Sequence, residues 1–88
     1  MAERYKVSIR VASLKGTCAN GHKVGDQWVI ERGTPAGLCL SAFNSMLPEL
    51  QVLMFGGSFP WAAAPDMAAV ACPDPNNPVV FELRRLHE

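Results

Sequence analysis

The chain has 88 residues, of which 49% are hydrophobic and 18% are charged, and its formal net charge at pH 7 is zero. This length suits a single core, so we expect one domain over residues 1–88. The charge balance gives no sign of the basic surface that nucleic-acid-binding proteins typically carry, so we expect no nucleic-acid partner.

The first predicted elements are two strands separated by a loop. Apolar residues alternate with charged and polar residues over 4–11, which is typical of a half-buried antiparallel strand. Glycines and the Asn20–Gly21 pair predict a loop with a tight turn over residues 15–26. A second, short strand is then predicted over residues 28–30, ended by Gly33.

A helical region is predicted next. Thr34 followed by Pro35 is a typical helix start, with a hydroxyl cap and then a proline at the first helical position. Apolar residues with helical spacing follow from Cys39 to Met54. Because Pro48 lies inside this stretch, we expect either one kinked helix or two consecutive helices that share a buried face.

The remaining chain predicts an apolar connection over residues 58–66, a short strand with Val70 and Cys72 on one face, a rigid turn over 73–78 and a last strand from residue 79. The predicted order is therefore β-β-α-α-β-β. It indicates an α+β fold: a small, mainly antiparallel sheet of about four strands, with kinked or paired helices on one face.

The chain contains three cysteines, an odd number that favours free thiols or metal ligands over a set of disulfides. Cys18 and His22 are close in sequence, and Cys39 and Cys72 lie further along. Together these four residues make a Cys3His set, a recognised composition for zinc that could also hold iron. A zinc ribbon would show two close pairs of ligands, and only one pair is present here.

Two other interpretations of the same residues stay open. Cys39 and Cys72 also fit an apolar core, since cysteine is among the most buried residue types. His22 taken alone is expected to be an exposed loop histidine. Alternatively, Cys39 is a reactive thiol near a helix start, although we expect it to lie beyond the first turn, where the helix dipole acts weakly.

Residues 58–65 are the second unusual segment, because they contain no charge and include Phe59 and Trp61. An apolar loop has to be covered by the core, a ligand or another subunit. Tryptophan is enriched at interface hot spots, and the chain carries few charges. We therefore expect a homo-oligomer formed through the Phe59–Trp61 loop.

The sequence also bears on location. Residues 1–6 carry charges of both signs, with no apolar stretch after them, so no secretory signal is expected. The uncharged stretch over residues 50–65 is interrupted by glycine and proline and is shorter than the ~18 residues of a spanning helix. We expect a cytoplasmic protein with no membrane partner.

Several blocks of the chain resemble a family of small, uncharacterised conserved proteins of bacteria and archaea. These blocks are Cys18–Asp26, which has the pattern Cys-x-x-Gly-His-Lys-x-Gly-Asp, Thr34–Cys39, Phe55–Trp61, and residues 72–85 with their Cys-Pro-Asp-Pro motif. The resemblance covers nearly the whole chain. It implies that the four Cys and His residues belong to the family's motifs, and it supplies no catalytic assignment.

The leading interpretation is a small metal- or thiol-dependent binding protein that uses Cys18, His22, Cys39 and Cys72. The alternative is a structural or oligomeric interaction module with core cysteines and a Phe-Pro-Trp contact loop. An enzyme with a reactive Cys39 is the least favoured interpretation.

Overall fold

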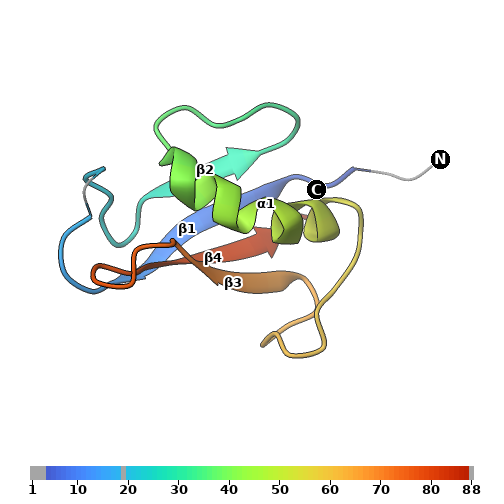
Figure 1. The fold of residues 1–88 in the computed structure, drawn as a ribbon. Coiled ribbons are helices and arrows are strands. Elements are labelled where there is room, and N and C mark those ends of the chain that lie inside the picture. Colours follow the sequence, from blue (N-terminus) through green and yellow to red (C-terminus); the bar gives the residue numbers. More distant parts are fainter. Residues whose placement is uncertain (1–3, 19, 88) are drawn as a thin grey trace.

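Four antiparallel strands form one sheet, and one helix lies across one of its faces (Figure 1). The structure is a computed structural model that describes residues 4–18 and 20–87. The elements are β1 (Val7–Leu14), β2 (Gln27–Ile30), α1 (Leu40–Met54), β3 (Met67–Ala71) and β4 (Val79–Arg85). The predicted α+β class with an antiparallel sheet is confirmed. The prediction of the order β-β-α-α-β-β is wrong, because the described residues contain one helix.

The strands lie in the order β2-β1-β4-β3. The central pair is β1 with β4, in which Val7 lies opposite Arg85 and Leu14 opposite Val79, with a register shift between Val11 and Ser13. β2 and β3 are therefore the two edges of the sheet. The first strand begins at Val7 and continues to Leu14, further along the chain than the alternation over residues 4–11 predicts.

The core lies between α1 and the sheet face that it covers. The predicted helical stripe is confirmed: Leu50 is fully buried, and Met46, Leu53 and Met54 are buried beside it. From the sheet, alternate residues of the two central strands point toward the helix, as period two requires. These buried strand residues are Val7, Ile9, Val11, Val79, Phe81 and Leu83.

The helix begins later than predicted. Its N-cap residue is Cys39, and Thr34 and Pro35 lie outside it. The reason is Gly37, whose φ of 83° is in the left-handed region that a right-handed helix cannot contain. Residues 34–37 thus form a turn before the helix starts, and the Thr-Pro pair does not start the helix.

Of the two alternatives expected at Pro48, one kinked helix or two consecutive helices, the structure has one helix, from Leu40 to Met54. Pro48 is exposed, whereas Met46 and Leu50 on either side of it are fully buried. Proline has no N–H to donate to the carbonyl of Asn44. The two halves nevertheless bury the same face, and that shared packing is what continues the helix past the proline.

The face of the sheet opposite the helix carries charged side chains. Arg10 Nη2 lies 3.4 Å from Glu82 Oε2, and Arg84 lies within 3.6 Å of Glu82 and 3.9 Å of Asp66. Partly exposed pairs of this kind contribute little to stability. They show that the basic residues of this face have acidic neighbours. No helix in the described part of the chain is both long and apolar enough to cross a membrane.

Candidate functional site

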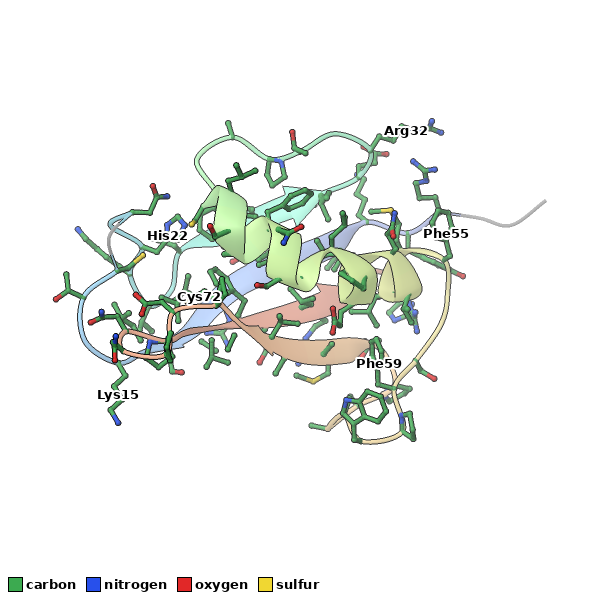
Figure 2. The ribbon with its side chains drawn as sticks, viewed as in Figure 1. Lys15, His22, Arg32, Phe55, Phe59 and Cys72 are labelled. Atoms are coloured by element: carbon green, nitrogen blue, oxygen red, sulfur yellow. The ribbon has the colours of Figure 1, made fainter. Side chains whose placement is uncertain are left out.

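All three cysteines of the chain line one cavity of about 400 Å³. Cys18 comes from the loop after β1, Cys39 is the N-cap of α1, and Cys72 follows the last residue of β3. Each of them is partly buried against the edge of the core. Three thiols from distant parts of the sequence are therefore gathered at one end of the sheet, the end at which Figure 2 labels Cys72 and His22.

The β3–β4 connection positions Cys72. Its backbone N–H donates to the carbonyl of Val79 at 2.9 Å, which extends the ladder between the two strands by one pair. The N–H of Val79 donates to the sulfur of Cys72 at 3.3 Å. The thiol also points toward the carbonyl of Asn77, 3.9 Å away. A sulfur that accepts a backbone hydrogen bond is held in place by the turn itself.

A polar network joins the loop of Cys18 to the turn after Cys72. Asp74 Oδ1 accepts from the backbone N–H groups of Asn76 and Asn77 at 3.0 and 3.3 Å. Asn77 Oδ1 in turn accepts from the backbone N–H of Thr17 at 3.1 Å. Gly16 allows this approach, because a Cβ there would overlap Asn77 Oδ1. Asn77 therefore ties the residue before Cys18 to the turn that follows Cys72.

From the sequence, Asn77 is expected only as part of a rigid turn. The Asp-Pro-Asn-Asn spacing does predict that the Asp74 side chain caps the turn, since aspartate commonly bonds to backbone N–H groups two or three residues later. The contact with Thr17 joins residues 60 positions apart. Local spacing carries no signal for such a contact.

His22 is buried, with 6% of its surface exposed, so the expectation of an exposed loop histidine is wrong. Its ring makes edge contacts with Trp28 and Phe81, at centroid distances of 5.0 and 6.2 Å. These aromatic rings rise from β2 and β4 on the helix side of the sheet. The Gly21 N–H bond to the Cys18 carbonyl, 3.0 Å long, forms the predicted turn and directs the chain inward at His22.

His22 holds the start of the helix. The backbone N–H of Cys39 donates to His22 Nε2 at 3.0 Å, and the side-chain amide of Asn20 lies 3.4 Å from the same nitrogen. A backbone N–H only donates, so Nε2 is the acceptor, and the proton of the neutral ring is on Nδ1. The imidazole thus positions Cys39 through its backbone.

Cys39 lies at the N-cap of α1, which corrects the expectation that it lies beyond the first turn. No side chain caps the helix start, and its first turn contains no acidic residue. The first N–H groups of a helix lack partners within the helix and favour negative charge nearby. The start of α1 therefore adjoins the cavity at Cys39, and Cys18 and Cys72 line other parts of its wall.

The four predicted metal ligands do not all occupy the same place. Cys18, Cys39 and Cys72 line the cavity, whereas His22 lies behind Cys39 and its Nε2 is already hydrogen-bonded. Across residues 4–18 and 20–87, no group of three or more Cys, His, Asp or Glu side chains is arranged to hold a metal ion. The arrangement is a cavity with three thiols on its walls, supported from behind by an imidazole.

The Phe59–Trp61 loop lies away from this cavity. Trp61 is 80% exposed, and its ring packs at 5.3 Å, centroid to centroid, against the partly buried ring of Phe59. The Arg85 guanidinium holds the base of the loop by donating to the carbonyls of Gly57 and Pro65 at 2.8 and 3.4 Å. The loop is anchored at its base and presents an indole ring to solvent.

Comparisons of this chain with family models, curated proteins and solved structures give no match. The similarity of its motifs to a family of small bacterial and archaeal proteins therefore stays a prediction.

Proposed function

We propose that this chain is a small thiol-dependent binding protein, and that its ligand is a thiophilic metal ion such as zinc or iron. The single observation that carries the proposal is that Cys18, Cys39 and Cys72, the only cysteines of the sequence, line the same cavity. If the thiols served only as small core residues, nothing would require all three to gather at one opening.

The surroundings of the cavity support a sulfur site. Val79 donates its N–H to the sulfur of Cys72, and the uncapped start of α1 adjoins Cys39. An N–H donor beside a sulfur atom is compatible with the thiolate, the form in which cysteine binds metal. Cys18 and Cys72 lie in the connections that follow β1 and β3, and these connections would have to move for the thiolates to close on one ion near 2.3 Å. In this proposal His22 positions Cys39, and it becomes the fourth ligand only if its bond to the Cys39 N–H breaks.

We also propose a cytoplasmic location. The three cysteines form no disulfide in the structure, which is compatible with a reducing compartment.

Metal binding is tested by native mass spectrometry and elemental analysis of the untagged protein, loaded with zinc or ferrous iron. We expect about one ion per chain, and we expect each of Cys18→Ser, Cys39→Ser and Cys72→Ser to lower the affinity by about tenfold or more. Thr17→Ser is the matched control, because it changes the same loop and leaves every sulfur in place.

Thiol alkylation gives an independent measurement on the same samples. Zinc held by all three sulfurs should slow the reaction of Cys18, Cys39 and Cys72 with iodoacetamide together. A wild-type protein that binds neither metal, and whose three thiols react at rates unaffected by zinc, would overturn the proposal.

A second candidate function is assembly, and one observation favours it: Trp61 is 80% exposed in the single chain. We propose that the Phe59–Trp61 loop contacts another copy of the protein and forms a homo-oligomer. Aromatic residues with this exposure are typical hot spots once a partner covers them.

Sedimentation velocity over a range of concentrations tests assembly. Trp61→Ala should weaken it, whereas Val24→Ala should not, since Val24 is also exposed (60%) but lies in the loop before β2. A wild-type chain that sediments as a monomer at every concentration would exclude this second function.

A further inference from the structure

The two edges of the sheet differ in how they are protected. β3 has five residues, Met-Ala-Ala-Val-Ala, with no charged side chain and no proline. β2 has only four residues and is followed directly by Glu31 and Arg32. Proteins usually protect an edge strand from pairing with other chains by charge, proline, a bulge or short length. β3 has neither charge nor proline. Its pairing with β4 continues without a register shift from Met67 to Ala71, so it has no bulge either.

The hydrogen bonds at both ends of β3 show which backbone groups face outward. Asp66 accepts from the N–H of Arg85, and Cys72 donates to the carbonyl of Val79, so even-numbered residues bond to β4. In an antiparallel ladder the intervening residues point their N–H and C=O groups the other way. Ala69 and Ala71 therefore direct their backbone groups away from the sheet, where no strand of the described chain pairs with them. The N–H of Met67 points the same way but already donates to the carbonyl of Ala64 at 3.3 Å, so Ala69 and Ala71 supply the N–H groups that an added strand would meet.

The side chains of this edge are small and uncharged. A hollow of about 180 Å³ lies beside β3, between Trp61 to Ala63 on one side and Met67 to Ala69 on the other. The exposed indole of Trp61 thus adjoins the free edge, and the hollow between them has the uncharged lining that an added strand would cover. An extended, uncharged chain fits both features. Its backbone can bond to the free groups of β3, and its side chains can cover the uncharged hollow.

We infer that β3 pairs with β3 of a second copy, antiparallel, about a two-fold axis at Ala69. In this register Ala69 lies opposite Ala69 of the partner subunit, and Met67 lies opposite Ala71 of the partner subunit. The strand that meets its copy carries no charge, and the whole chain has a formal net charge of zero, so the two copies have no net electrostatic repulsion. The two sheets join into one continuous eight-stranded sheet. The inference rests on the proposed homo-oligomer and adds its contact and register.

Amide hydrogen exchange read by NMR tests the pairing in the wild-type protein. The Ala69 and Ala71 amides should exchange about fivefold more slowly at a total concentration about ten times the dimer Kd than in the monomer, because about one fifth of the chains then remain monomeric. Val70 is the internal control, since its backbone bonds to β4 in monomer and dimer alike.

A charged edge tests the register. Ala69→Lys places two lysines opposite each other at the axis, and should raise the dimer Kd by about tenfold or more. Gln27→Lys is the matched control, because it adds the same exposed charge to the other edge of the sheet. Circular dichroism of both variants checks that they fold.

Each outcome decides the inference. Slower exchange at Ala69 and Ala71 together with dissociation by Ala69→Lys alone supports it. A dimer that Trp61→Ala dissociates, but whose Ala69 and Ala71 amides exchange independently of concentration, overturns the β3 pairing and leaves assembly through the loop. A wild-type protein that is always monomeric overturns both proposals.

Discussion

The two regions with proposed roles lie at opposite ends of the molecule, as the labels of Cys72 and Phe59 in Figure 2 show. The thiol cavity is built from three segments that are distant in sequence and packed against the core. The Phe59–Trp61 loop is one continuous segment that projects from its base with an 80% exposed tryptophan. We therefore expect a change in the thiol cavity to disturb folding and binding together, and a change in the Phe59–Trp61 loop to alter assembly alone.

The largest loss of stability is expected from a change in the core that supports both regions. Leu50 is fully buried under the sheet, so Leu50→Ala should lower the free energy of unfolding by about 2–5 kcal/mol through lost burial and a residual cavity. Urea denaturation followed by circular dichroism measures this. Val52→Ala on the exposed side of the same helix is the control. A loss for Leu50→Ala no larger than that for Val52→Ala would contradict the assigned core.

The next largest loss of stability is expected at His22, beside the thiol cavity. His22→Ala should lower the free energy of unfolding by about 1–3 kcal/mol, because it leaves the part-buried N–H of Cys39 without its acceptor and removes the ring between Trp28 and Phe81. His22→Gln should recover part of the loss, since a glutamine oxygen can accept in place of Nε2. Equal stability of His22→Ala and wild type would show that His22 does not support the helix start.

A smaller loss of stability is expected from a change in the polar network that joins the loop of Cys18 to the turn after Cys72. Asn77→Ala removes the acceptor of the Thr17 N–H and the side-chain amide that lies 3.4 Å from Asp74 Oδ2, and each such hydrogen bond contributes about 0.5–1.5 kcal/mol. Because this contact holds the residue before Cys18, the alkylation rate of Cys18 should rise. Asn76→Ala is the control, as only the backbone of Asn76 joins the network. An unchanged Cys18 rate would separate the network from the thiol site.

The smallest effect on stability is expected at Trp61. In dilute, monomeric protein, Trp61→Ala should change the free energy of unfolding by less than about 0.5 kcal/mol, as is usual for exposed side chains. The same urea experiment measures it. If Trp61→Ala destabilises the monomer as strongly as Leu50→Ala does, the loop is part of the core and the contrast between the two regions disappears.

The sequence allowed the features set by local pattern to be predicted. Strand alternation, the helical stripe around Leu50 and the apolar character of the loop at Trp61 all follow from spacing and composition. The pairing of β1 with β4, which places Arg10 beside Glu82, does not follow from local pattern.

Features that depend on tertiary contacts could not be predicted in this way. The start of α1 was misplaced because the φ of Gly37 is a property of the folded turn. His22 was expected in solvent because nothing near it in sequence indicates that the rings of Trp28 and Phe81 pack against it. The convergence of Cys18, Cys39 and Cys72 on one cavity depends on contacts across the whole chain, and the sequence indicated only that these residue types were available.

The order of the sheet has a consequence for how the protein forms. The central strands, β1 and β4, come from opposite ends of the described chain, so their contacts join residues about as far apart in sequence as the domain permits. Until residues 79–85 leave the ribosome, β1 has only β2 beside it and β3 has no neighbouring strand. Long-range pairing of this kind slows folding, because the entropy of closing a long loop is lost before the contacts form. We therefore expect the thiols and the edge of β3 to be exposed together during synthesis, and to become ordered together when β4 enters the sheet.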